Sequence, residues 1–222
     1  MTLNKEALIG VIESIAKKLI DSEKILTELD SHIGDADCGA GIKRGFEAVL
    51  AELGELRNYD PPDIFKKVGF TLACTIGGTS GAMLGTGFIE TGKSLSNAAE
   101  INMKTIASAL EDALAVIKRR GGNTELEDKT LIDALQPAIE SIRVSAESGE
   151  QNIVSILEKA CAAAREGSDR TVDMVARKGR ASYLGDRSKG HRDPGSVYIT
   201  LMFEAALERI KTGGNTCGVI KL

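Results

Sequence analysis

The sequence lacks three features that would each assign it to a class of protein: a long hydrophobic run, closely spaced cysteines and an excess of positive charge. Its apolar stretches are short and interrupted, so we expect no membrane span, and charges within residues 1–19 argue against a signal peptide. With a net charge of −4, the chain has no electrostatic reason to bind nucleic acid. These absences favour a cytoplasmic, globular protein.

The few cysteines do not form a recognisable framework. No C-x-x-C pair is present, which argues against a zinc site and against a small disulfide scaffold. We therefore expect reduced thiols, as is usual in the cytosol. The cysteines are Cys38, Cys74, Cys161 and Cys217. At 222 residues, with 42% hydrophobic and 27% charged residues, the chain is long enough to form one domain, 1–222, with a substantial core.

Alternating apolar and polar residues, the pattern of β-strands, are nearly absent, whereas helical periodicity is present along most of the chain. The first helix is expected to begin after Asn4, a suitable N-cap, and a later one to follow Asp37 and stop at Gly54. Pro61 or Pro62 suits the first turn of the next helix. The apolar stripe of the first helix consists of Leu8, Val11, Ile12, Ile15 and Leu19.

About eight helices with short connections predict an all-α fold, an antiparallel up-down bundle or barrel. In such a fold alternate connections lie at the same end. The four connections rich in glycine, aspartate and serine would share one end, and we expect the functional site there; they are residues 30–41, 77–81, 121–128 and 179–195. The remaining helices are expected at about Gly81–Leu95, Met103–Arg120, 129–146 with a bend at Pro137, 151–177 and Ser196–Lys211.

The segment GFIETGKS, Gly87–Ser94, fits the phosphate-binding P-loop pattern G-x-x-x-x-G-K-[ST]. That loop works where a buried strand delivers it to a helix N-terminus. No β-branched core run precedes this segment, and Gly81, Gly85 and Gly92 fall near one helical face. We interpret these glycines as contacts between helices, and the pattern as a chance match.

The acidic stretch LDSHIGDADCGAG carries a stronger signal. Asp35 and Asp37 would point the same way from an extended backbone, and Gly34 would let the chain fold back to bring Asp30 close. Three neighbouring carboxylates repel one another unless a cation neutralises them, and hard cations such as Mg²⁺ prefer oxygen ligands. An EF-hand is excluded, because Phe46 stands at the twelfth position counted from Asp35. The alternative is that Asp37 caps a helix and the other carboxylates are solvated.

Two other loops have the residues that a metal-bound nucleotide would need. The loop GGTSG at 77–81 precedes a helix, so its N–H groups and the Ser80 hydroxyl suit phosphate. The segment 179–196 contributes Arg180 and Arg187 as anion partners. The alternative for both is a structural one, since glycine-rich loops often only turn and loop arginines are mostly solvated.

One histidine of the chain falls in the acidic stretch and the other in the segment 179–196. His191 is a candidate general acid or base. Because no carboxylate partner can be identified from the sequence, a structural role fits His191 at least as well. His32, in the acidic stretch, either orients a ligand or faces water.

Four motifs, LDSHIGDADCG, GGTSG, DKTLIDALQPA and GRASYLGDRSKGHRDPG, together resemble the L subunit of dihydroxyacetone kinases, in the same order over nearly the whole chain. The resemblance implies an eight-helix antiparallel barrel with ADP, or ATP, and two Mg²⁺ ions at one end. Asp30, Asp35 and Asp37 would hold the metals, and with Arg180 they would carry the catalysis. The implied nucleotide-binding residues are Cys38, Gly39, Ala40, Gly41, Thr79, Ser80, Gly122, Leu131, Arg180, Asp193, Pro194 and Gly195.

The resemblance also implies a partner. In this family the substrate ketone is held by a separate K subunit or domain, through a covalent bond to a histidine. Free-standing L subunits keep ADP as a bound coenzyme that a phosphoprotein of the phosphotransferase system rephosphorylates, whereas fused relatives use ATP. The chain would then be a phosphotransferase subunit for dihydroxyacetone or a related keto-sugar. Two alternatives stay open: a non-catalytic ADP-bearing adaptor for a transcription regulator, and an ATP-dependent kinase subunit for a four-carbon keto-sugar.

The chain departs from the family pattern at the acidic stretch. Where the family usually has D-G-D-H-G-x-N, Cys38 replaces the histidine and Gly41 replaces the asparagine. Glu127 stands where a glycine is common. These changes would alter nucleotide affinity, substrate choice or the phosphate donor, or mark a copy with reduced catalysis. A metal-bound Cys38 thiolate is disfavoured, because Mg²⁺ avoids sulfur.

Overall fold

The computed structural model describes residues 2–213 and 220–221, which are almost entirely helical. Two short strands, β1 (Thr2–Leu3) and β2 (Ile220–Lys221), pair in antiparallel fashion. The α-helices of these residues are α1 (Lys5–Asp21), α2 (Glu23–Ile33), α3 (Cys38–Leu56), α4 (Pro61–Thr75), α5 (Gly78–Asn97), α6 (Met103–Arg120), α7 (Ile132–Glu147), α8 (Ile153–Arg170) and α9 (Pro194–Gly213). Two 3₁₀ helices, η1 (Thr171–Asp173) and η2 (Arg180–Ser188), lie between α8 and α9.

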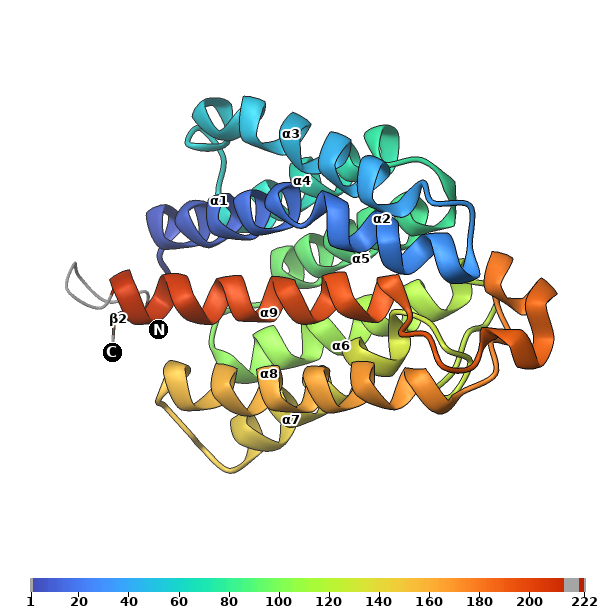
Figure 1. The fold of residues 1–222 in the computed structure, drawn as a ribbon. Coiled ribbons are helices and arrows are strands. Elements are labelled where there is room, and N and C mark those ends of the chain that lie inside the picture. The colour runs from blue at the N-terminus through green and yellow to red at the C-terminus, as the bar shows by residue number, and fades with distance from the viewer. Residues whose placement is uncertain (1, 214–219, 222) are drawn as a thin grey trace.

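The helices form a closed cycle of neighbours. From α3 to α9 each helix packs against the next along the chain, and α1 packs against both α3 and α9 (Figure 1). The short α2 lies beside α3 and also contacts α9. The predicted all-α class is confirmed, and this cycle of neighbours is the one that an up-down barrel requires. A regular eight-helix barrel remains a prediction, because α2 adds a further helix at one end of the cycle.

Several predicted helix starts are confirmed. The Asn4 side chain accepts a hydrogen bond from the backbone N–H of Ala7 and so caps α1. Pro61 begins α4, and α6 has the predicted bounds Met103–Arg120. Pro137 lies inside α7 without ending it.

Other boundaries were wrong. The helix α3 runs through Gly54 to Leu56, and α5 and α9 begin earlier than expected, at Gly78 and Pro194. Residues 23–33 form a separate helix, so Asp30 lies on the last turn of α2 and not in a loop. The segment 180–188, expected to be a loop, is the 3₁₀ helix η2. The helix expected to reach residue 177 is α8, which ends at Arg170 and is followed by η1 up to Asp173.

The segment Gly87–Ser94 lies within α5, which confirms its interpretation as a helix and not a P-loop. A Cβ added at Gly85 would lie 2.6 Å from the Gly69 carbonyl oxygen, and one at Gly92 would lie 2.4 Å from the Pro62 carbonyl oxygen. Both contacts are with α4, so these glycines allow α4 and α5 to pack closely. Lys93 is exposed and pairs with Glu90 on its own helix, 3.4 Å away.

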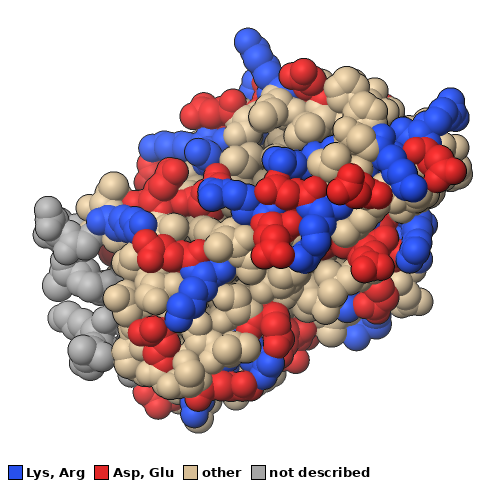
Figure 2. Space-filling model, turned by 60° about the horizontal axis from the view of Figure 1, so that its bottom comes forward, with Lys and Arg blue, Asp and Glu red and all other residues tan. Residues whose placement is uncertain are grey.

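The surface agrees with the composition. On the face drawn in Figure 2, acidic and basic side chains are intermixed, without an extended patch of one sign. None of the helices in the described part of the chain combines the length and the hydropathy that crossing a membrane requires. The thiols of Cys38, Cys74 and Cys161 are free, as predicted, and Cys217 lies outside the described residues.

The close packing of α4 and α5 generates a test of the fold. Gly92→Ala should lower the free energy of unfolding by about 1–3 kcal/mol, because its methyl group would overlap the Pro62 carbonyl. Gly54→Ala, within α3 and with open space around it, should raise that free energy by about 0.5–1 kcal/mol. Urea denaturation of both variants measures the two effects, and equal effects would contradict the predicted role of Gly92.

Candidate functional site

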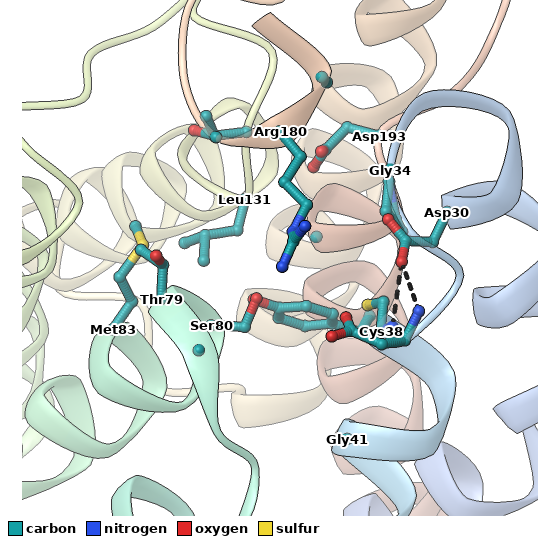
Figure 3. Close-up of a pocket in the computed structure, with 18 of the residues that line it drawn as sticks. Asp30, Gly34, Cys38, Gly41, Thr79, Ser80, Met83, Leu131, Arg180 and Asp193 are labelled. Atoms are coloured by element: carbon teal, nitrogen blue, oxygen red, sulfur yellow. Dashed lines mark hydrogen bonds between the residues drawn. The ribbon is translucent and has the colours of Figure 1, made fainter. Parts of the chain in front are cut away.

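A cavity of about 480 Å³ lies at the end of the molecule where α3, α5, α7 and α9 begin (Figure 3). Residues from all four predicted loops line it, in the ranges 30–44, 76–83, 121–131 and 178–198. The prediction that these loops share one end is therefore confirmed. Each helix reaches the cavity with its N-terminus because the up-down order places alternate helix starts at this end.

The helix N-termini give part of the cavity a positive potential. The lining includes residues at the starts of α3, α5 and α9, among them Cys38, Ser80 and Pro194. The first backbone N–H groups of a helix have no acceptor within it, and the helix dipole places positive charge there. Several such ends around one cavity favour an anion, above all a phosphate.

Three carboxylates stand on one side of the same cavity. Oxygen atoms of Asp30, Asp35 and Asp37 all lie within 4.8 Å of one another. The backbone that joins them is not extended as expected, because Ala36 has a φ of 61°, in the left-handed region. The predicted cluster is thus present, although the turn that forms it differs from the predicted one.

The side chain of Asp30 fixes this cluster to the start of α3. Its Oδ2 accepts hydrogen bonds from the backbone N–H groups of Asp37, at 2.9 Å, and Cys38, at 3.1 Å (Figure 3). Asp37 occupies the N-cap position of α3, but its side chain makes no capping hydrogen bond. The alternative that the Asp37 carboxylate caps the helix is therefore wrong: Asp30 supplies that carboxylate, and the Asp37 carboxylate is not used for capping.

Gly34 is required by the position of Asp30. A Cβ at Gly34 would lie 2.0 Å from Oδ1 of Asp30, so a side chain would displace the carboxylate. The predicted hinge is present, but its reason is close approach, since Gly34 has a φ of −140° that other residues also adopt.

Burial and charge make this cluster electrostatically unfavourable without a cation. Asp30 is only 8% exposed, and burial raises its pKa, as do the charges of Asp35 and Asp37. The N–H groups of Cys38 and Asp37 act in the opposite direction and lower that pKa. A divalent cation would offset the remaining repulsion, and a set of carboxylate oxygens is the donor set that Mg²⁺ prefers. The cluster therefore fits the predicted metal.

Two further groups face the acidic cluster. Arg180, at the start of η2, extends into the cavity (Figure 3). It pairs with Asp35, with 2.9 Å between Nη2 and Oδ2. The Cys38 thiol is largely enclosed, and burial together with the neighbouring carboxylates raises its pKa far above the ordinary value. Cys38 is therefore a neutral thiol in this surrounding, which agrees with the argument against a metal-bound thiolate.

A buried charge network forms another part of the cavity wall. Oδ2 of Asp193 accepts a hydrogen bond from the backbone N–H of Ser196, at 2.6 Å, and caps α9. The Lys129 ammonium donates to the carbonyl oxygens of Thr171, at 2.5 Å, and His191, at 2.6 Å. The Asp193 carboxylate is enclosed although the residue keeps some exposed surface, and this burial raises its pKa to about 7. Burial lowers the pKa of Lys129, against the opposing effect of Asp193.

The loop before α7 is strained. Glu127 and Lys129 have positive φ angles of 68° and 60°. Asp133 holds this loop, since its two carboxylate oxygens accept hydrogen bonds from the N–H groups of Glu127 and Thr130. Left-handed backbone favours glycine, which explains why a glycine suits position 127 and why Glu127 is a costly residue there.

The two histidines stack on each other. Their ring centroids are 4.7 Å apart and their planes are inclined by 18°. Neither ring lines the cavity, so the pair joins α2 to the segment before α9 from outside. This arrangement favours the structural alternative for His191. His32, expected either to orient a ligand or to face water, is exposed and lies outside the cavity lining. The predicted anion partner Arg187 is exposed and does not line the cavity.

Nearly all of the predicted site residues line the cavity, and Gly39 and Gly122 are the exceptions. Gly39 faces α2, where an added Cβ would lie 2.2 Å from the Glu23 carbonyl oxygen. Gly122 is not in the lining itself, but its carbonyl accepts a hydrogen bond from the lining residue Lys178. The placement in the cavity is shown, whereas the role of each residue stays a prediction.

Sequence reasoning missed several lining residues. Arg44 ties α3 to the end of α4 through the carbonyl oxygens of Thr75 and Ile76, and no pattern in its helix distinguishes it from a solvated arginine. Other missed lining residues are Met83, Lys129, Lys178 and Tyr198. Only Lys129 had a signal, since it stands within the DKTLIDAL motif.

Known proteins resemble this chain over nearly its whole length. Residues 32–208 match the DAK2 domain family. The chain is 36% identical over 207 residues to the ADP-binding subunit DhaL of the PEP-dependent dihydroxyacetone kinase of Escherichia coli (strain K12), a match that covers 92% of this chain and 96% of that subunit. It is 34% identical over 193 residues to the ADP-binding subunit DhaL of the PTS-dependent dihydroxyacetone kinase of Lactococcus lactis, covering 86% of this chain and 91% of that subunit.

A solved structure resembles the fold as well. The dihydroxyacetone kinase from C. freundii in complex with AMP-PNP and Mg²⁺ has a TM-score of 0.71 and 28% sequence identity to this chain. That match covers 94% of this chain but only 34% of the kinase chain, so this chain corresponds to about a third of that longer protein.

The raised pKa of Asp193 generates a test of the buried network. Between the ordinary value of 3.8 and about 7, the folded protein binds a proton that the unfolded chain has lost, so Asp193 destabilises the fold increasingly as the pH rises through this range. The advantage of Asp193→Asn over the unsubstituted protein in free energy of unfolding should therefore grow by roughly 1–3 kcal/mol between about pH 5 and pH 8.

Urea denaturation without nucleotide or divalent cations measures this difference. Asp186→Asn is the matched control, because it makes the same substitution at a side chain that is 90% exposed. An Asp193→Asn advantage that is the same at both pH values would contradict the assigned pKa.

Proposed function

Because this chain belongs to the DAK2 domain family, among the L subunits of dihydroxyacetone kinases, we propose that it binds ADP with Mg²⁺ and serves in phosphoryl transfer to a small ketone. One observation carries the proposal: the cavity combines helix N-termini, which suit phosphate, with three clustered carboxylates, which suit a divalent cation. A negatively charged ligand and a carboxylate cluster are compatible in one cavity only when a cation lies between them.

The residues of the cavity divide into three roles under this proposal. Asp30, Asp35 and Asp37 would hold Mg²⁺, two ions in the form that the family suggests, and the metal supplies charge neutralisation at the phosphates. The first N–H groups of α5 and the hydroxyls of Thr79 and Ser80 would bind phosphate oxygens. On the apolar side, Leu131 would contact the base and ribose.

Arg180 would offset the charge that develops on the transferred phosphoryl group. Phosphoryl transfer depends mainly on positioning and on neutralisation of charge. The guanidinium already lies in the cavity, and its partner there is Asp35, one of the proposed metal ligands. A phosphate group, like a carboxylate, offers two acceptor oxygens to a guanidinium, so Arg180 can exchange Asp35 for the nucleotide.

The acceptor and the phosphate donor would both come from partners. A K-type subunit would present dihydroxyacetone over the open end of the cavity. A phosphoprotein of the phosphotransferase system is the favoured donor, since the relatives named PEP-dependent and PTS-dependent are ADP-binding subunits that this chain matches over 96% and 91% of their length. ADP would then stay bound as a coenzyme in the cytoplasm.

A second candidate is an ADP-bearing adaptor without catalysis, which would report to a transcription regulator. The neutral Cys38 thiol favours it, because this thiol replaces an imidazole beside the phosphates and is a much weaker hydrogen-bond donor. Choice of a four-carbon keto-sugar in place of dihydroxyacetone would depend on the partner, which holds the ketone.

The metal assignment is tested by Asp35→Asn and Asp37→Asn. Each removes a charged ligand, so each should weaken Mg²⁺-dependent ADP binding by at least about tenfold, the loss that even indirect support of a metal causes. Isothermal titration calorimetry with ADP, with Mg²⁺ and with EDTA, measures this. Asp186→Asn controls for lost charge and Lys93→Ala for the rejected P-loop, and both should bind as the unsubstituted protein does. Full retention by Asp35→Asn and Asp37→Asn would overturn the assignment.

The catalytic role is tested by reconstitution. With a K-type subunit, dihydroxyacetone and the phosphorylated phosphoprotein, the chain should support formation of dihydroxyacetone phosphate, detected by coupled reduction. Arg180→Lys should keep ADP binding within about threefold but lose most of this activity, because Lys lacks the planar fork. Tight ADP binding by the unsubstituted chain without any transfer would favour the adaptor.

A further inference from the structure

Tyr198 is a large, fully buried side chain in the wall of the cavity. It lies on α9, one turn after Pro194, and its exposed fraction is 0%. Although it is buried within the apolar core, it also lines the cavity together with residues of α3 and α5. Its position therefore joins the core to the part of the cavity where two helix N-termini meet.

The hydroxyl of Tyr198 has no hydrogen-bond partner among the described residues. Burial is the main reason that its pKa is raised, with further contributions from Cys38 and Asp193, so the phenol stays protonated. Ser80 is close enough to lower this pKa, but no hydrogen bond of acceptable geometry joins the two side chains. A buried donor without an acceptor is unfavourable, and native proteins rarely keep one.

The neighbours of this hydroxyl indicate what it lacks. Ser80 stands in the first turn of α5 and Cys38 at the start of α3, the two helix ends that favour an anion. A phenol O–H is a donor, and the group that would satisfy it at this place is an acceptor oxygen with negative charge. The only other buried side-chain atom without a partner in the described chain, Oε1 of Gln136, is an acceptor and does not line the cavity.

We propose that the Tyr198 hydroxyl donates a hydrogen bond to a phosphate oxygen of the bound nucleoside diphosphate, beside Ser80. This inference rests on the proposed nucleotide site and adds a binding residue from α9, beyond those taken from the family motifs. Tyr198 thereby connects ligand binding to the core, because the same ring that packs between the helices carries the donor.

Tyr198→Phe tests the proposal through two readouts that move in opposite directions. Without nucleotide, its free energy of unfolding should be unchanged or higher, because the variant removes a buried donor that has no partner. Its dissociation constant for ADP with Mg²⁺ should rise about tenfold, the effect of a lost hydrogen bond to a charged group. Tyr183→Phe, at an 87% exposed tyrosine, should change neither quantity.

The same experiment separates this inference from the proposed function. If the unsubstituted protein binds ADP with Mg²⁺ and Tyr198→Phe binds it equally well, the Tyr198 contact is overturned while the proposed function stands. If Tyr198→Phe is less stable without nucleotide, the hydroxyl already has a partner in the protein, which also overturns the contact. If the unsubstituted protein does not bind ADP, the proposed function fails and the inference fails with it.

Discussion

The hydrogen bonds between the Asp30 carboxylate and the first N–H groups of α3 are the contact on which the site depends. They join the end of α2 to the start of α3 and hold the short turn that carries Asp35 and Asp37. A carboxylate at a helix N-terminus is favourable, which offsets part of the cost of burying Asp30. The contact also demands a glycine at position 34, since any side chain there would meet the carboxylate. One buried carboxylate thus shapes the loop and also belongs to its acidic cluster.

The cavity brings opposite charges together for a structural reason. In a cycle of up-down helices, alternate helix starts lie at one end, so positive helix termini collect there in addition to the basic side chains that line the cavity. The acidic turn between α2 and α3 lies at this same end. A ligand that contains both phosphate and a divalent cation matches both halves of the cavity, and Arg180, paired with Asp35, stands between them. This complementarity, together with the family of the chain, supports a nucleotide site.

Helical periodicity and local motifs were enough to predict most of the helices, the end that bears the site and its acidic cluster, whereas most of the other site residues were implied by the resemblance to the L subunits. They were enough because the period of an amphipathic helix is local, and because Asp30, Asp35 and Asp37 are close in sequence. Gly39 and Tyr198 show the limit of such reasoning. Which face of α3 or α9 points into the cavity depends on how neighbouring helices pack, so the sequence did not show that Gly39 faces α2 or that Tyr198 lines the cavity. The P-loop match failed because its eight letters do not specify the buried strand that must precede a P-loop.

The central claim is that the three carboxylates hold a divalent cation against the phosphates of a nucleotide. Crystals grown with ADP and Mn²⁺ in place of Mg²⁺ test it most directly, since Mn²⁺ can be located by its anomalous scattering. We expect an anomalous peak bounded by Asp30, Asp35 and Asp37 on one side and by the phosphates of ADP on the other. ADP in the cavity without a metal peak beside these carboxylates would contradict the account.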